Sequence, residues 1–236
     1  MSNEMLLILN LIFLYSSVVI FYKYLGAKGL IYWTIFATIA ANIEVLIMVE
    51  AFGMSQTLGN IMFATTFVVT DILSEIEGKK KANEAVKVGI LTSLFFIMVT
   101  QFWLRFTPSS DDWAFSSIKT IFSSTPRVIF AGLGVYAIVQ KLDIYLYHKW
   151  WDLTERIFGN KNSGLWIRNN GSTLISQLAN AVLFTFMAFY GTYDMKTLVD
   201  ICISTYVIFT VTSICDTPFV YLAKWLKENG KVYQEN

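Results

Sequence analysis

The sequence predicts an all-α integral membrane protein with about seven transmembrane helices. Of its 236 residues, 55% are hydrophobic and only 15% are charged, whereas a soluble domain would carry about 25% charged residues. The charged residues are grouped between long apolar runs, and an uncharged run of about 18 residues or more can cross a bilayer as a helix. Lysine and arginine are concentrated in alternate connections between these runs, which is typical of multi-pass membrane proteins.

The first expected span is the uncharged run from Met5 to Tyr22, and six further apolar runs follow it. The spans are expected at residues 5–22, 29–49, 57–76, 86–104, 117–140, 169–191 and 197–223. This divides the chain into an extra N-terminal helix with its connection (1–28), a six-helix core (29–225) and a cytoplasmic tail (226–236). Because an odd number of helices reverses the direction of the chain, we expect the core to consist of two inverted three-helix halves.

The basic residues predict the orientation of the chain. The connections after the first, third, fifth and seventh spans contain most of the lysines and arginines, and the alternate connections contain only Arg105, Lys119 and Lys196. Since an excess of basic residues marks cytoplasmic connections, we expect the N-terminus outside and the C-terminus in the cytoplasm.

The connection after the fifth span alternates apolar and charged residues at helical spacing. Its sequence, KLDIYLYHKWWDLTERIFGN, favours a helix over residues 141–158 that lies on the cytoplasmic surface with Trp150 and Trp151 among the lipid headgroups. The segment also contains His148, the only histidine of the chain. We interpret it as an interfacial side chain rather than a catalytic group or metal ligand, and we expect no metal and no cofactor.

Two carboxylates end the third span, in the stretch VVTDILSEIEGKKK. A charged side chain near the bilayer centre costs at least about 2.5–3.5 kcal/mol, so Asp71, more than one turn inside the span, is expected to bind substrate or to pair. Glu75 lies four residues later on the same helix face, and it either joins this site or pairs with Lys79 and Lys80. Gly78 is the predicted helix stop.

Arg127 is the second charged residue expected deep in the membrane, near the middle of the fifth span. Pro126 precedes it, and a proline inside a helix removes a backbone hydrogen bond and kinks the helix. Irregular backbone at this depth is tolerated where it faces a cavity or packed protein. Arg127 is therefore expected to form a wall of a binding site, and the alternative is a structural ion pair with Asp71.

Further polar residues come from the second, sixth and seventh spans. Gln177 and Asn180 share one helix face, where amides either bind a ligand or join helices. Asp216 lies near the cytoplasmic end of the seventh span. In the second span we favour Asn42 over Glu44 as the residue that faces a common centre, because the two side chains point about 200° apart on a helix. Polar residues from five spans together predict one polar cavity near the middle of the membrane.

Three stretches resemble the queuosine precursor transporters, also called the vitamin uptake transporter family. They are TDILSEIEGKKKA (70–82), NNGSTLISQLANAVLFTFMAF (169–189) and CDTPFVYL (215–222). The resemblance covers residues 30–225 and implies import of a 7-deazaguanine across a bacterial inner membrane, either 7-cyano-7-deazaguanine, its aminomethyl relative or queuine. The substrate-binding residues expected from the polar positions inside the spans are Asp71, Arg127, Gln177, Asn180, Asn42, Asp216 and Glu75.

The sequence departs from the family pattern at two positions. Asn180 stands where an aspartate is usual, and Ile208 stands where a lysine is frequent. Losing both charges together is consistent with their pairing in relatives, because losing one alone would leave an unpaired charge inside the membrane.

Two other functions are compatible with the sequence. One is the substrate-binding membrane subunit of an energy-coupled vitamin importer. The other is an intramembrane aspartyl enzyme using Asp71 and Asp216, whose carboxyl groups would then lie within hydrogen-bonding distance. The expected partners are the small-molecule 7-deazapurine, the lipid bilayer and a second copy of the chain in a homodimer. The net charge of +1 provides no polycation for nucleic acid.

Overall fold

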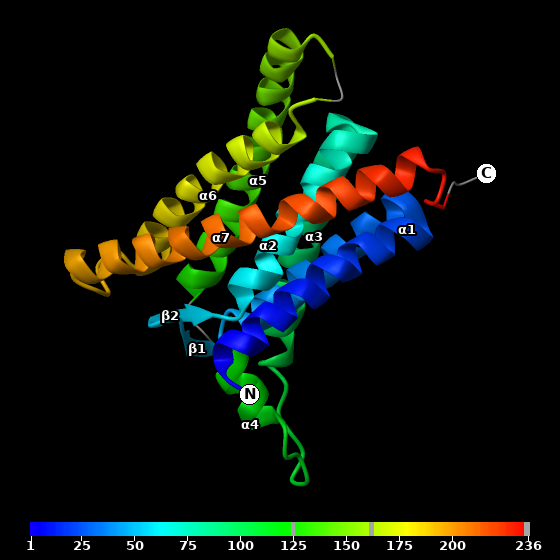
Figure 1. Cartoon of the computed structure of the whole chain (residues 1–236). Helices are drawn as coiled ribbons and strands as arrows, with labels where there is room; N and C mark the ends of the chain where they lie inside the picture. Colours follow the sequence, from blue (N-terminus) through cyan, green and yellow to red (C-terminus); the bar gives the residue numbers. More distant parts are fainter. Residues whose placement is uncertain (124–125, 161–162, 234–236) are drawn as a thin grey trace.

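The computed structural model describes residues 1–123, 126–160 and 163–233. Long helices dominate it, with one short β-hairpin at the side of the bundle (Figure 1). In the described residues, α1, α3, α6 and α7 are each long and apolar enough to cross a membrane. The predicted all-α membrane fold is therefore confirmed.

Helix α1 (Asn3–Glu44) contains the first two expected spans as one folded-back pair. At Gly26 the backbone takes φ 60° and ψ −149°, a conformation open essentially to glycine. The rings of Phe21 and Trp33 are 5.3 Å apart, although twelve residues of straight helix would separate them by about 18 Å. Asn3 near the start of α1 also donates to the carbonyl of Glu50, 2.9 Å away, just beyond the end of α1. The two legs of α1 therefore run antiparallel.

A hairpin replaces the end of the second expected span. The helix ends at Glu44 rather than at residue 49, and strands β1 (Met48–Ala51) and β2 (Met54–Thr57) pair antiparallel. Phe52 and Gly53 connect them with φ values of 54° and 71°, as a two-residue hairpin turn requires. The apolar composition of this segment predicted a longer helix because hydropathy alone does not distinguish a short apolar strand from a helix.

Helix α2 (Gly59–Ile72) continues into a π-helical turn, η1 (Leu73–Glu77), and α3 (Lys79–Trp103) begins after one intervening residue. That residue is Gly78, with φ 86°, whose amide donates to the carbonyl of Leu73. The predicted helix stop at Gly78 is confirmed. A π-turn often marks a functional position in a helix, and this one begins two residues after Asp71.

The fifth expected span is divided. Helix α4 covers Phe115–Phe122 and α5 covers Pro126–Phe158, while residues 124 and 125 lie outside the described part of the chain. The prediction that Pro126 kinks the middle of a span is wrong: it is the first residue of α5, a position where the missing N–H of proline costs nothing.

The expected separate helix at 141–158 is the second half of α5, which continues without a break. Trp150 and Trp151 are half-buried and contact α6, where a side chain on Gly171 would come within 2.9 Å of the Trp150 indole. The apolar stripe of this segment thus packs against another helix, which hydropathy cannot distinguish from packing against lipid, and its position at the membrane surface stays a prediction.

Helix α6 (Leu165–Phe189) packs between α5 and α7 (Met195–Glu228). The chain after α7 folds back onto the bundle: Val232 is buried, and the amide of Tyr233 donates to the carbonyl of Lys23. The C-terminal end thus lies at the turn of α1, and the N-terminus lies at the opposite end of the first leg (Figure 1). This separation agrees with an odd number of spans, and the inverted repeat of the two halves stays a prediction.

Candidate functional site

One face of α6 carries a continuous row of buried polar side chains. Their spacing of three and four residues places them on a single stripe, and none is more than 5% exposed: Asn169, Ser172, Thr173, Ser176, Gln177 and Asn180. Buried polar groups are usually paired, and the partners of this stripe are carboxyl groups from three other helices.

The first partner is Asp216 of α7. Its Oδ1 accepts from Nδ2 of Asn169 at 2.7 Å, and the same amide lies 3.2 Å from Oγ1 of Thr217. Nδ2 of Asn170 also donates to Thr217, at 2.8 Å. The carbonyl oxygens of both asparagine side chains are buried and accept no hydrogen bond among the described residues. This end of the stripe therefore holds acceptors without donors.

The other two carboxyl groups come from α2 and α5. Oγ1 of Thr173 donates to Oδ2 of Asp71 at 3.3 Å, and Oγ of Ser176 donates to Oδ1 of Asp143 at 2.8 Å. Both aspartates are fully buried. Asp71 interacts electrostatically with Asp143 and with Asp216. We refer to Asp71, Asp143 and Asp216 as the carboxyl cluster.

Amide groups continue the polar interior beyond the cluster. Nδ2 of Asn180 donates to Oε1 of Gln177 at 3.2 Å. On the facing helices, Gln140 of α5 donates to Thr66 of α2 at 2.7 Å and accepts from Thr70 at 3.2 Å. Asp71 and Asp216 thus contact the stripe of α6 that also carries Gln177 and Asn180, and their convergence on one binding site stays a prediction.

Glu75 belongs to a different set of contacts at the end of α2. Both its oxygens accept hydrogen bonds: Oε2 from Nε of Arg168 at 2.6 Å and from the Tyr147 hydroxyl at 2.8 Å, and Oε1 from Nη2 of Arg168 and from Nζ of Lys224 at 2.7 Å. The guanidinium of Arg168 also lies over the ring of Trp151, at 4.2 Å. We call Glu75, Tyr147, Arg168 and Lys224 the clamp, since they join η1 to α5, α6 and α7.

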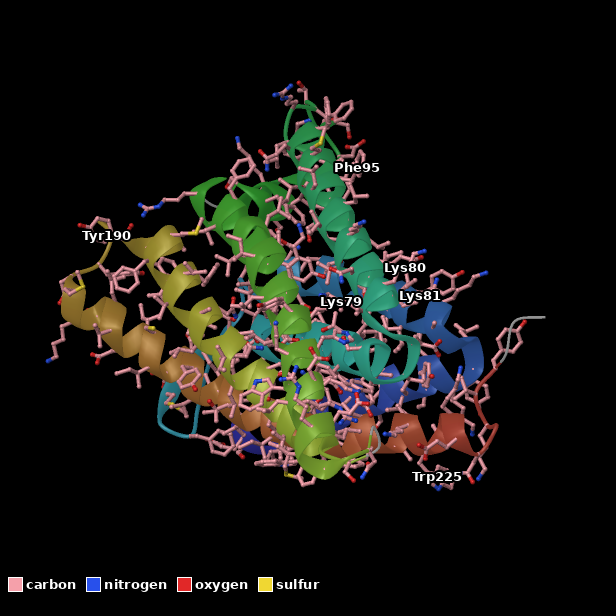
Figure 2. All side chains as sticks on the ribbon, turned by 90° about the horizontal axis from the view of Figure 1, so that it is seen from above. Lys79, Lys80, Lys81, Phe95, Tyr190 and Trp225 are labelled. Carbon is pink, nitrogen blue, oxygen red and sulfur yellow. The ribbon has the colours of Figure 1, made fainter. Side chains whose placement is uncertain are left out.

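The expected pairing of Glu75 with Lys79 and Lys80 is wrong. Both lysines lie exposed at the first turn of α3 (Figure 2), because the π-turn and Gly78 redirect the chain between the glutamate and the lysines. Glu77, two residues beyond Glu75, pairs instead with Lys227 of α7 at 3.0 Å.

Two further predicted site residues lie elsewhere. Arg127 is exposed in the first turn of α5 and donates through Nε to the carbonyl of Met187 at 2.8 Å, so neither the site wall nor the pair with Asp71 is formed. The reason is that α5 begins at Pro126, which places Arg127 at a helix end. Asn42 is half-buried near the end of α1 and donates to the carbonyl of Thr38 in its own helix at 2.6 Å.

Sequence reasoning missed Asp143, Asn169 and Arg168. Asp143 was assigned to a surface segment, although its spacing from Gln140 and Tyr147 places all three on one face of a helix. That shared face was the available signal. Asn169 begins the sixth expected span and Arg168 lies in the connection before it, and nothing in their local sequence distinguishes a buried amide or guanidinium from an exposed one.

The carboxyl cluster lies apart from two surface grooves of the bundle. These grooves, of about 430 and 260 Å³, are lined mainly by apolar side chains of α1 with α3 and of α1 with α7, and no residue of the cluster lines either. In the described residues no group of three or more histidine, cysteine, aspartate or glutamate side chains is arranged to hold a metal ion. The cavity expected at the cluster stays a prediction.

The family model described as "Putative vitamin uptake transporter" matches residues 57–223, which contain the carboxyl cluster and most of the clamp. This chain belongs to the vitamin uptake transporter family. The match of more than half of the chain bears out the resemblance seen in the three sequence stretches.

A member of similar length is the "Probable queuosine precursor transporter" of Bacillus subtilis (strain 168). It is 40% identical over 214 residues, which is 91% of this chain and 91% of the relative. No solved structure matches the chain. Together with the long apolar helices, family membership identifies the chain as a multi-pass membrane protein of a transporter family.

Proposed function

We propose that the chain imports a 7-deazaguanine precursor of queuosine, such as 7-cyano-7-deazaguanine, across the bacterial inner membrane. The substrate class is supported by the relative from Bacillus subtilis, because 40% identity extends over nearly the whole of both chains. The structural observation that carries the proposal is the surplus of buried hydrogen-bond acceptors at the centre of an apolar helix bundle.

The chemistry of the base fits these acceptors. A deazaguanine presents a ring N–H and an exocyclic amine side by side, next to a lactam oxygen. The unpartnered side-chain oxygens of Asn169 and Asn170, with the carboxylates of Asp71 and Asp216, accept from such donors. The amide groups of Gln177 or Asn180 then donate to the lactam oxygen. A base held in this way satisfies groups that are costly to leave unpaired.

Import requires the cluster to open to each side of the membrane in turn. Helix α6 and its partners carry the cluster, and the clamp closes the end of the bundle that contains the basic residues after the first, third and seventh spans. With these basic residues in the cytoplasm, the N-terminus lies outside. The clamp then closes the cytoplasmic side.

The test is a rescue assay in a bacterium that can neither make 7-deazaguanines nor import them. The chain is expressed, precursor is supplied at nanomolar concentration, and queuosine in tRNA is measured. We expect restored modification with the wild type, none with Asp71→Asn, and full restoration with Asp111→Asn, which changes an exposed aspartate of the α3–α4 connection.

Either of two results contradicts the proposal. Failure of every precursor to restore modification, with the chain present in the membrane, rejects the substrate class. Wild-type rescue by Asp71→Asn rejects the carboxyl cluster as the binding site. Rescue that depends on a copurifying ATPase would assign the chain to an energy-coupled importer instead of a stand-alone carrier.

A further inference from the structure

Two oxygens of the carboxyl cluster are left without a partner by the hydrogen bonds described above. They are Oδ1 of Asp71 and Oδ2 of Asp143, both buried and both without a donor among the described residues. The other oxygen of each group is held from α6, by Thr173 and Ser176. Thr173 and Ser176 lie three residues apart on one face of α6, and Asp71 interacts electrostatically with Asp143, so the orphaned oxygens belong to neighbouring groups.

We propose that Asp71 and Asp143 hold one shared proton between them, and that this proton crosses the membrane together with the substrate. The inference rests on the proposed function and adds its energy source: one proton and one neutral base leave the outer side, and both arrive in the cytoplasm.

Charge balance supports a bound proton. The ion pairs of the described residues use Glu75, Glu77 and Glu84 as their acids, and none includes a member of the carboxyl cluster. Three ionised carboxylates side by side in a low-dielectric interior would each be destabilised by desolvation and by mutual repulsion. One shared proton removes a charge and provides the donor that both orphaned oxygens lack.

The groups that face the pair come from every neighbouring helix. Tyr15 of α1 and Tyr147 of α5 interact with Asp71, and Asp216 of α7 interacts with both members of the pair. Helix α6 contributes only neutral hydroxyl groups next to the pair. No cation therefore competes with a proton there among these groups.

The same arrangement connects the proton to the clamp and leaves an oxygen of Asp71 able to accept a hydrogen bond from the base. Tyr147 donates to Glu75 of the clamp and also interacts with Asp71, so it lies between the pair and the end of the bundle where the proton would leave. Oδ2 of Asp71 accepts only the long bond from Thr173 at 3.3 Å, and it remains able to accept an N–H of the base.

The first experiment tests the proton without any substrate. The infrared spectrum of the purified full-length chain at neutral pH should contain the carbonyl band of a protonated carboxyl group, seen as a difference between the wild type and the asparagine variants. We expect the band to be lost in Asp143→Asn and in Asp71→Asn, and kept in Asp143→Glu and in the control Asp152→Asn, which changes an exposed aspartate of the same helix. A band that persists in both asparagine variants, or is absent from the wild type, overturns the shared proton.

The second experiment tests coupling in liposomes with the membrane potential clamped to zero. With 7-cyano-7-deazaguanine outside, acidifying the outside by one pH unit should accumulate the base about tenfold at equilibrium, as one proton per base requires. Asp143→Asn should accumulate it less than twofold, while Asp152→Asn behaves as the wild type. Equal accumulation without a pH gradient, or accumulation driven by a sodium gradient alone, overturns proton coupling. Absence of any uptake at any pH contradicts the proposed function, while the infrared band still decides whether the proton is present.

Discussion

Removing the buried ion pair of the clamp should lower the stability of the protein far more than removing an ion pair at the surface. Glu75→Gln keeps the size of the side chain but removes the carboxylate that neutralises Arg168 and Lys224. Glu75 and Arg168 have fully buried side chains, and Glu75 receives all its hydrogen bonds from α5, α6 and α7. The substitution therefore weakens the contact between η1 and three other helices at once.

The expected magnitude follows from this burial. Removing one partner of a buried ion pair costs about 3–5 kcal/mol, because the remaining charge stays desolvated. For a chain of this size each kcal/mol lowers Tm by about 2–4 °C, so Tm should fall by about 6–20 °C. The matched control is Glu84→Gln, which removes the ion pair with Lys81 at 2.9 Å, where both side chains are nearly half exposed. Such a surface pair contributes about 0–1 kcal/mol.

The assay is thermal unfolding of the two variants and the wild type in the same detergent. Substrate affinity is measured below the transition, and it should not change in Glu75→Gln, because both oxygens of Glu75 are occupied by protein donors. Equal Tm values for the two variants would refute the clamp. Lost affinity without a change in Tm would return Glu75 to the substrate site, where the sequence first placed it.

Three further predictions test other parts of the structure. Gly26→Ala should lower the free energy of unfolding by about 1–3 kcal/mol in the same assay, since it forces a side chain into a glycine conformation within 2.9 Å of the carbonyl of Tyr233. Gly132→Ala, where the new atom meets only ordinary contacts, should change the free energy of unfolding little. Equal effects of the two substitutions would contradict the proposed turn. Asn169→Ala should raise the Kd for the base about two- to tenfold in a binding titration, because a hydrogen bond between neutral groups contributes about 0.5–1.5 kcal/mol. An unchanged Kd would remove this end of the stripe from the site. Arg127→Ala should restore tRNA modification as the wild type does, and loss of rescue despite normal membrane expression would show that Arg127 reaches the substrate in another conformation.

The sequence was sufficient for the membrane fold, for most helix positions and for half of the polar interior. Charge-free runs long enough to cross a bilayer can only be helical there, so composition determines the architecture. The cost of burying a charge likewise singled out Asp71 and Asp216, and shared faces singled out Gln177 and Asn180. These inferences need only the periodicity of a helix and the properties of a bilayer.

Only the tertiary structure decided what each charged residue contacts. Whether Glu75 meets Lys79 or Arg168 depends on a π-turn and a glycine that redirect the chain between neighbouring residues, and the sequence does not specify that direction. Asp143 was expected at the surface and is buried, whereas Arg127 was expected deep in the membrane and is exposed. The start of α5 at Pro126 decides both, because it fixes which residues lie at a helix end and which lie deep in the bundle. A hydrophobic stripe has the same sequence pattern whether it faces lipid or another helix, and only packing distinguishes the two.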